Sequence, residues 1–272
     1  MSTAAEAIHA ADSFLVFTGA GMGVDCVPSL PTFRGPTAKG WTHSLTGAAI
    51  DYYDICQPQY FRMPSSDMCA EAWKFWRSCR EAYQAAVPHE GYHILKELTA
   101  GKPTEFVTTN VDCHHEKVGI QAYEIHGSIR HLQCARPDIA NCTELHSWDA
   151  EECSECGGAL RPNILMFHDA DYIDDHQEEL KEKYGTFIHE QEGKKLVMFS
   201  IGVGGTVPTI QGEIGYVRRY VSNATLVRIN PYLPASPYTL AEGALSGLRR
   251  LKEQVAQLEK EEREAQPGVV GV

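Results

Sequence analysis

Basic residues are scarce in this 272-residue sequence, which has 24 Lys and Arg against 36 Asp and Glu and a formal net charge of −12. A general nucleic-acid binder needs many Lys and Arg side chains to displace phosphate counterions, so we expect no nucleic-acid partner. No apolar run reaches the roughly 20 residues of a membrane span, and the first residues lack the basic and then apolar pattern of a signal peptide. We therefore expect a cytoplasmic protein without a membrane partner. Internal repeats are absent, and no pattern indicates an oligomeric state.

A regular disulfide framework is missing as well, because the nine cysteines are an odd number and are unevenly spread. Five are scattered, whereas Cys134, Cys142, Cys153 and Cys156 fall within 23 residues. This distribution indicates a reducing compartment and one metal site.

The stretch Cys153-Ser-Glu-Cys156-Gly-Gly has the spacing of half a zinc site, in which two thiolates bind one ion and the glycines permit the turn. Cys134 and Cys142 would complete a four-cysteine site, and His146 is an alternative to Cys142 as the fourth ligand. A closed site with four ligands is structural, so we assign zinc to folding and not to catalysis. The alternative is that these cysteines are free buried thiols.

Apolar segments that end in glycine or polar loops alternate with helical patterns along the chain. The expected strands lie within residues 13–20, 104–112, 122–128, 194–205 and 224–231. The expected helices lie within residues 3–11, 66–86, 89–98 and 245–265. Strands alternating with helices over this length predict an α/β protein with a doubly wound parallel sheet. The last helix has leucines on one side; a coiled-coil partner is conceivable, but packing on its own domain is favoured because the repeat is short.

The ends of the expected strands carry the residues with chemical potential. Gly19-Ala20-Gly21 follows the first strand, where a glycine turn lets backbone N–H groups approach a pyrophosphate. A tight turn needs glycine without any ligand too, so this motif alone is weak. The strand ends at residues 109–112, 126–128 and 202–205 strengthen it, because in a doubly wound sheet such ends converge on one crevice.

Two of these ends offer side chains for catalysis. His126 has an ordinary pKa near neutrality and could act as a general base, although a lone histidine is more often structural. Asn110 and Asp112 alternate along their strand end, so their side chains point to the same side. They either cap a turn or bind hydroxyl groups and orient a water molecule.

Taken together, these motifs resemble those of the sirtuins, the NAD-dependent protein lysine deacylases. The similar segments are "GAG", "FRG", "TTNVD", "EIHGS", the four cysteines, "RPNILMF" and "VRINP", in the family's order from about Phe14 to Pro231. More narrowly, "GAGMGVD", "VPHEGYHIL" and "HGSIRHLQC" are similar to a mainly bacterial and protist branch of the family.

The resemblance implies a Rossmann-like NAD-binding domain formed by residues 1–35, 87–130 and 163–272. It also implies a small inserted domain made of a helical module, residues 36–86, and a zinc-binding module, residues 131–162.

The resemblance further implies roles for individual residues. His126 would be the general base, and Asn110 and Asp112 would contact water, ribose and the nicotinamide amide. The cofactor-binding residues would be Gly19, Ala20, Gly21, Phe33, Arg34, Asn110, Asp112, Gly202, Gly204 and Asn230. The peptide substrate would add as a strand along Asn163, Ile164, Leu165, Met166 and Phe167. Structural Zn²⁺ would be bound by Cys134, Cys142, Cys153 and Cys156.

The implied activity uses NAD as a co-substrate. An acylated lysine in a protein or peptide would react to give nicotinamide, free lysine and O-acyl-ADP-ribose. The alternatives are a protein ADP-ribosyltransferase, an NAD hydrolase, or a non-catalytic sensor of NAD or ADP-ribose. A further alternative, a zinc-containing interaction module, leaves the four loops unexplained.

Several positions depart from the family's pattern. Cys26 and Val27 stand where Ser-Gly is usual, and His168-Asp169 replaces Gly-Glu after Phe167. The Tyr-x-x-Arg pair that selects succinyl and malonyl groups is not evident, since the matching helix offers Trp76-x-x-Cys79. We therefore expect an uncharged acyl group, such as acetyl.

Overall fold

The computed structural model describes residues 3–32, 40–205 and 208–265. Its helices are α1 (Ala4–His9), α2 (Tyr52–Ile55), α3 (Asp67–Ala85), α4 (Glu90–Leu98), α5 (His114–Lys117), α6 (Pro137–Ala140), α7 (Glu178–Glu190), α8 (Thr209–Tyr220) and α9 (Ala244–Ala265), with 3₁₀ helices η1 (Ala20–Asp25), η2 (Pro58–Arg62) and η3 (Asp175–Gln177). Its strands are β1 (Ser13–Thr18), β2 (Trp41–Thr42), β3 (Ala49–Ile50), β4 (Thr104–Thr108), β5 (Tyr123–Glu124), β6 (Gly127–Cys134), β7 (Leu160–Ile164), β8 (Leu196–Ile201), β9 (Thr225–Ile229) and β10 (Thr239–Leu240).

The chain divides into two compact units. The first unit contains residues 1–25, 88–106 and 184–272, and the second contains residues 26–87 and 107–183. β4 and α7 cross the boundary between them. The division into one large domain and two small modules, expected from the sequence, stays a prediction.

The main sheet has the strand order β10-β9-β8-β1-β4-β5. β1 pairs with β8, β8 with β9, β9 with β10 and β4 with β5, all in parallel. The chain starts in the middle of the sheet and proceeds first to one edge and then to the other, as in dinucleotide-binding folds. The predicted doubly wound parallel sheet is confirmed. In such a sheet the loops after β1 and β8 flank the point where the strand order reverses.

The two central strands are held by apolar burial on both faces. All six residues of β1 and all six residues of β8 are buried. The rings of Phe14 and Phe199 stack with centroids 5.8 Å apart. A strand that is buried on both faces has a continuous run of apolar residues, and this pattern predicts both strands from the sequence.

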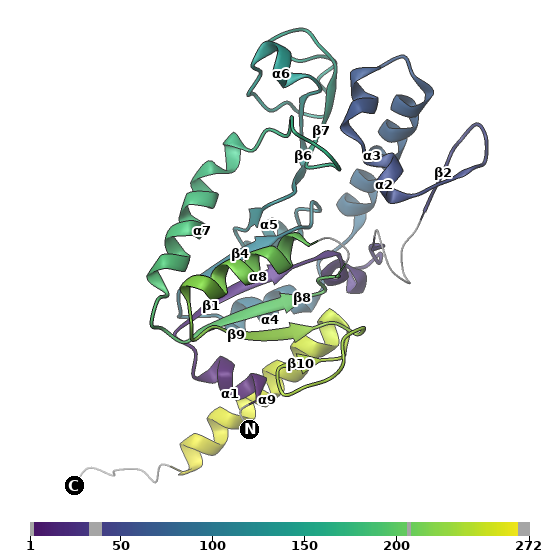
Figure 1. The fold of residues 1–272 in the computed structure, drawn as a ribbon. Helices are drawn as coiled ribbons and strands as arrows, with labels where there is room; N and C mark the ends of the chain where they lie inside the picture. Colours follow the sequence, from purple (N-terminus) through teal and green to yellow (C-terminus); the bar gives the residue numbers. More distant parts are fainter. Residues whose placement is uncertain (1–2, 33–39, 206–207, 266–272) are drawn as a thin grey trace. The chain divides into compact units, whose positions relative to one another are not determined.

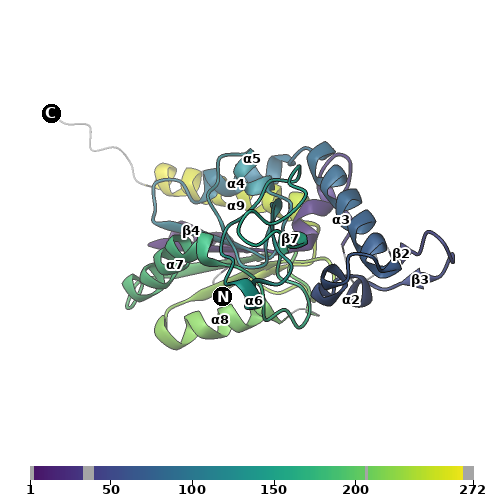
Figure 2. The ribbon, with the colours of Figure 1, turned by 90° about the horizontal axis from the view of Figure 1, so that it is seen from above.

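Helices cover both faces of the sheet within the first unit. Figures 1 and 2 show α4 and α9 on one face and α8 on the other. α9 contacts α1, α4 and η1, and buries Leu248 and Leu251 completely. The last helix therefore packs on its own unit, as the sequence favoured. Within the described residues, no helix is long and apolar enough to cross a membrane.

The second unit contains the long helix α3 and a short β2–β3 hairpin beside it. Ser66 caps α3 by accepting a hydrogen bond from the backbone N–H of Cys69, as expected from the sequence. Glu71 of α3, although only 1% exposed, accepts hydrogen bonds from Trp41 Nε1, the backbone N–H and hydroxyl of Ser44, and Lys74 Nζ. This one carboxylate thus attaches the hairpin to the helix.

The antiparallel pair β6–β7 forms the rest of the second unit's framework. Its register pairs Leu132 with Pro162, Gln133 with Arg161 and Cys134 with Leu160. Trp73 of α3 and Trp148 pack against the small core at the cysteine end of this pair, with ring centroids 5.9 Å apart. The helical and cysteine-rich segments therefore share one apolar core.

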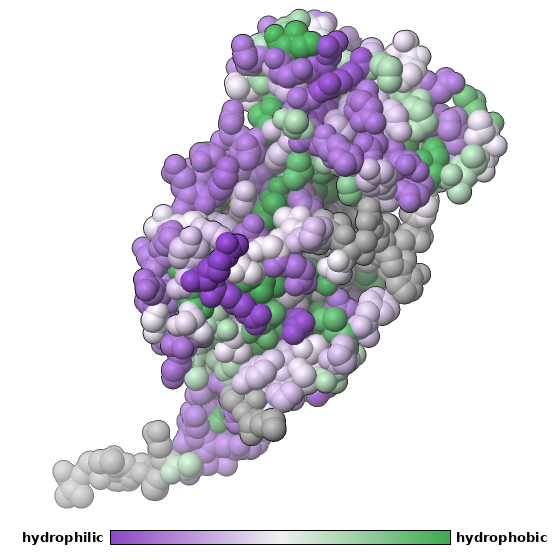
Figure 3. Space-filling view, viewed as in Figure 1, coloured by the Kyte–Doolittle hydropathy of each residue, from purple (hydrophilic) through white to green (hydrophobic). Residues whose placement is uncertain are grey.

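On the face of the molecule in Figure 3, hydrophobic residues are mostly interspersed among hydrophilic ones. A small hydrophobic patch lies over α6, whose Ile139 is 61% exposed. Isolated exposed apolar residues of this kind are ordinary on protein surfaces.

Candidate nucleotide and acyl-peptide site

The glycines after β1 are explained first by contact between two backbones of the first unit. Gly21 N–H donates to Gly202 O at 2.9 Å. A Cβ at Gly21 would lie 2.7 Å from Gly202 Cα, and one at Gly19 would lie 2.9 Å from Gly202 O. Gly202 itself has a φ of +62°. The loops after β1 and β8 therefore fit together only with these glycines, whatever the ligand.

Gly204 is different, because a Cβ there would meet no atom of the described residues within 4 Å. The loop that contains it is held by Asn230, whose Nδ2 donates to Val203 O at 2.8 Å while its Oδ1 accepts from Tyr232 N–H at 2.9 Å. Asn230 thus positions the loop after β8 from the end of the neighbouring strand β9. Packing among the described residues does not require glycine at position 204, whereas a ligand approaching the backbone would.

Of the other three cofactor residues predicted for this region, the structure describes one. Ala20 opens the 3₁₀ helix η1 directly after β1 and is partly buried. Phe33 and Arg34 lie outside the described residues.

Asn110 and Asp112 follow β4 in the second unit, and both are buried. Asp112 Oδ1 accepts the backbone N–H of His114 at 3.0 Å, which starts the short helix α5. The backbone N–H of Asn110 donates to Thr108 Oγ1 at 3.0 Å. Asp112 therefore makes the capping contact that the sequence allowed as one of two alternatives. A carboxylate has two oxygens, so this contact does not exhaust its capacity as an acceptor.

His126 is partly buried and lies between the end of β5 and the start of β6. Burial lowers the pKa of His126 to about 4, although a hydrogen bond with the Thr109 backbone acts in the opposite direction. The imidazole is therefore neutral near pH 7, and one of its ring nitrogens is an acceptor. Gly127, with a φ of +78°, follows because a Cβ there would lie 2.3 Å from Asn163 O. The close approach of β7 thus requires the glycine after the histidine.

The segment predicted to bind a peptide, residues 163–167, is only partly accessible. Asn163 and Ile164 belong to β7 and are buried, and Met166 is 6% exposed. Asn163 Nδ2 donates to Gln133 Oε1 and Ile173 O, so its side chain holds the interior of the unit. Leu165 and Phe167 are half-buried and are the members of the segment able to touch a ligand.

The four clustered cysteines come together at the end of the β6–β7 pair. The Sγ atoms of Cys134, Cys142, Cys153 and Cys156 lie within 4.8 Å of one another. Cys134 Sγ and Cys156 Sγ are 3.7 Å apart, close to the roughly 3.8 Å edge of a tetrahedron with Zn–S bonds of about 2.3 Å. His146 does not belong to this group. The four thiols fit a tetrahedral zinc ion, with Cys142 as the fourth member.

Sequence reasoning did not anticipate a buried contact between Cys26 and His114. Cys26 Sγ lies 3.4 Å from His114 Nδ1, and His114 Nε2 lies 3.2 Å from Tyr83 O. A carbonyl can only accept, so Nε2 carries a hydrogen, and Nδ1 is the ring nitrogen that faces the Cys26 thiol. The residues are 88 positions apart, and no local pattern connects them.

Comparison with known proteins identifies the lineage. The model of the Sir2 family, whose members are the sirtuins, matches residues 19–190, which include both glycine loop residues after β1, His126 and all four clustered cysteines. The chain belongs to the Sir2 family.

Relatives within the Sir2 family include proteins from bacteria and archaea. The chain is 32% identical over 176 residues to NAD-dependent protein deacylase 2 of Pseudomonas aeruginosa, covering 62% of this chain and 66% of the relative, just under two thirds. It is 30% identical over 240 residues to NAD-dependent protein deacylase 2 of Pseudomonas syringae pv. tomato, covering 85% of this chain and 89% of the relative. It is also 30% identical over 192 residues to an NAD-dependent protein deacetylase of Bacillus subtilis, covering 62% and 69%.

Solved structures of the Sir2 family support the fold. A Sir2 homologue in complex with NAD has a TM-score of 0.68 at 20% identity, with 93% of each chain covered. A complex of Sir2 with a p53 peptide and NAD⁺ has a TM-score of 0.63 at 22% identity, with 93% of this chain and 97% of the other covered. These likenesses confirm the architecture of the protein.

Proposed function

We propose that the protein is an NAD-dependent protein lysine deacylase that produces nicotinamide, free lysine and O-acyl-ADP-ribose. The observation that carries this proposal is a neutral, partly buried His126 in the "EIHGS" segment of a chain that belongs to the Sir2 family. The relatives named deacylases and deacetylases, among them one aligned over 240 residues, support the same activity.

NAD would lie against the loops after β1 and β8. When bound, NAD supplies two things: the ribose carbon that the acyl oxygen attacks, and nicotinamide as the leaving group. Gly19, Ala20 and Gly21 would contact the pyrophosphate and ribose through their backbone, and Gly202 and Gly204 would lie near the adenosine. No atom of the described residues would lie within 4 Å of a Cβ at Gly204, which supports this assignment. Phe33 would cover the nicotinamide and Arg34 would meet the phosphates, by resemblance to the family.

Asn110, Asp112 and His126 would supply the polar groups of the reaction. Asn110 and Asp112 would bind water, ribose and the nicotinamide amide. His126 would take a proton from a ribose hydroxyl through the ring nitrogen that is an acceptor in the neutral imidazole. Its lowered pKa keeps this nitrogen unprotonated at neutral pH. Zinc would be bound by Cys134, Cys142, Cys153 and Cys156 and would take no part in the chemistry.

The substrate would be a protein or peptide that contains an acylated lysine with an uncharged acyl group. Burial raises the pKa of the Cys79 thiol to about 12, so this side chain is neutral. The nearest arginines of α3 are engaged by tryptophans: Arg77 lies over Trp73 at 5.4 Å and Arg80 over Trp148 at 4.9 Å. This arrangement favours acetyl over succinyl groups. A cytoplasmic location stays a prediction.

Mass spectrometry of the reaction products tests the proposal. The protein would be incubated with NAD and a panel of acyl-lysine peptides, beside His126→Ala and a surface control, His9→Ala. O-acyl-ADP-ribose should appear with the native protein and with His9→Ala, and should be absent with His126→Ala. Nicotinamide without deacylated peptide would instead indicate ADP-ribosyl transfer or NAD hydrolysis. Bound NAD without turnover would indicate a sensor.

A further inference from the structure

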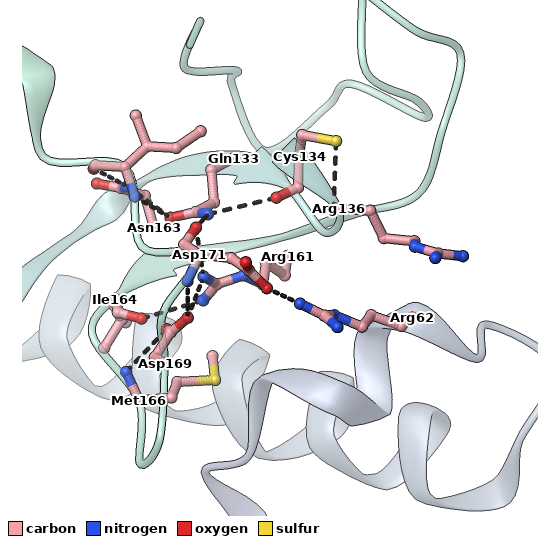
Figure 4. Close-up of polar contacts among 11 residues, drawn as sticks. Arg62, Gln133, Cys134, Arg136, Arg161, Asn163, Ile164, Met166, Asp169 and Asp171 are labelled. Carbon is pink, nitrogen blue, oxygen red and sulfur yellow. Dashed lines mark hydrogen bonds and ion pairs between the residues drawn. The ribbon is translucent and has the colours of Figure 1, made fainter. Parts of the chain in front are cut away.

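The chain reverses direction just after β7, and the side chain of Asp169 closes this turn (Figure 4). Asp169 Oδ2 accepts the backbone N–H of Met166 at 3.1 Å. Oδ1 accepts from Arg161 Nη2 at 2.8 Å and from the backbone N–H of Asp171 at 3.3 Å. Both oxygens of this carboxylate are therefore occupied, and its side chain is completely buried.

Arg161 of β7 holds the carboxylate from the strand side. Its guanidinium is also fully buried and donates to Ile164 O at 3.3 Å and to Asp171 O at 3.1 Å. These hydrogen bonds satisfy the guanidinium in part, since Arg161 Nε has no partner among the described residues. Loss of one member of a buried ion pair leaves an uncompensated charge. Arg161 and Asp169 thus connect the two limbs of the turn that contains residues 164–169.

This turn determines which backbone groups of the segment are used up. The N–H groups of Leu165, Met166 and Phe167 donate to His126 O at 2.9 Å, to Asp169 Oδ2 and to Cys56 O at 3.2 Å, respectively. Within residues 3–32, 40–205 and 208–265, the carbonyl oxygens of Leu165 and Met166 accept no hydrogen bond. Leu165 and Met166 therefore offer a ligand backbone acceptors and no backbone donors.

We propose that Asp169 is a positioning residue for substrate binding in the proposed deacylase. Its carboxylate takes up the Met166 N–H and fixes the turn, so that the carbonyl groups of Leu165 and Met166 are presented to the backbone N–H groups of an acyl-lysine peptide. A positive φ of 55° at His168 lets the chain return to Asp169 over this short distance. The inference rests on the proposed function, and it assigns peptide affinity, not chemistry, to this residue.

Asp169→Asn tests the proposal because an amide has one acceptor oxygen where the native carboxylate has two in use. The matched control is Asp171→Asn, which removes another carboxylate of the same loop. That carboxylate pairs with Arg62. Losing a hydrogen bond to a charged group changes a binding constant by about tenfold. For Asp169→Asn we expect the KM for the acyl peptide to rise about tenfold, with kcat and the KM for NAD nearly unchanged. The control should leave all three unchanged.

Two further readouts do not depend on Asp169→Asn being an active enzyme. Hydrogen exchange followed by mass spectrometry should speed up across residues 164–169 in Asp169→Asn and stay native in Asp171→Asn. On the native protein, peptides methylated at single backbone nitrogens beside the acyl-lysine test the acceptor carbonyls directly. For at least one such peptide, the KM should rise about tenfold.

The outcomes separate the two proposals. A folded Asp169→Asn with native peptide KM and native exchange would overturn the role of Asp169, as would native KM values for every methylated peptide. Equal effects in Asp169→Asn and Asp171→Asn would do the same. A native protein that deacylates no peptide would contradict the proposed function, while the exchange comparison would still decide whether Asp169 holds the segment.

Discussion

At the scale of single residues, the glycines of the two loops differ in what requires them. Gly21 faces the backbone of Gly202, whereas a Cβ at Gly204 would meet nothing within 4 Å in the part of the chain that the structure describes. We expect Gly21→Ala to lower the free energy of unfolding by about 2–3 kcal/mol, because the new Cβ would lie 2.7 Å from Gly202 Cα. Gly204→Ala should keep native stability within about 0.5 kcal/mol and weaken ADP-ribose binding. Thermal unfolding and calorimetric titration measure the two effects, and a destabilised Gly204→Ala with native affinity would contradict this division.

His126 makes a second prediction at this scale. Burial lowers the pKa of its imidazole to about 4, against an ordinary value of 6.5. The imidazole is thus neutral at every pH above about 5. The acid limb of the pH profile of kcat/KM should therefore be centred near pH 4 and not near pH 6.5. The pH profile of kcat/KM measures this, with unfolding at each pH as the control. A limb centred near pH 6.5 on a folded protein would show that the free enzyme has an exposed, ordinary histidine.

At the scale of elements, the cysteine-rich end of β6–β7 should depend on its metal. The Cys153→Ser variant removes one of the four clustered thiols, whereas Cys69→Ser changes a buried thiol of α3 outside the cluster. We expect one zinc ion per chain in the native protein and in Cys69→Ser, and none in Cys153→Ser, which should also unfold at a lower temperature. Elemental analysis and thermal unfolding measure this. Full zinc content in Cys153→Ser would show that these cysteines are not the ligands.

The attachment of the β2–β3 hairpin predicts an acid-dependent loss of stability. Burial would raise the pKa of Glu71, but hydrogen bonds from Ser44, Lys74 and Trp41 outweigh it and lower the pKa to about 2, from 4.5. The Glu71 carboxylate takes up a proton at higher pH in the unfolded chain than in the folded protein. Its contribution to the free energy of unfolding is therefore complete above about pH 4.5 and is lost as the pH falls toward 2. Glu71→Gln should be less stable at pH 7 and lose less stability on acidification than the native protein. Parallel pH dependences of the two proteins would refute the assignment.

The elements also show what the sequence could and could not predict. β1, β8 and α3 were recognised because a continuous apolar run and a serine cap are local signals. β10 has two residues and exists through its pairing with β9, and α8 starts without a side-chain cap, so neither has a strong local signal. Among site residues, His126 and the four cysteines lie in short motifs. The Arg161–Asp169 pair depends on a turn, and the Cys26–His114 contact joins distant segments, so only the folded chain shows them.

At the scale of the whole molecule, a chain with a net charge of −12 contains a doubly wound parallel sheet, a cluster of four cysteines and a neutral histidine near a strand end. Charge does not exclude the proposed substrate, because acylation removes the positive charge of lysine. In the proposed function, NAD cleavage and deacylation are one coupled reaction.

The most direct test is the stoichiometry of that reaction. Nicotinamide, deacylated peptide and O-acyl-ADP-ribose would be quantified together over time from one mixture of the protein, NAD and an acetyl-lysine peptide. A deacylase should form the three products in a 1:1:1 ratio, and His126→Ala should form no O-acyl-ADP-ribose. Nicotinamide formed in excess of deacylated peptide, or formed equally without peptide, would contradict the account.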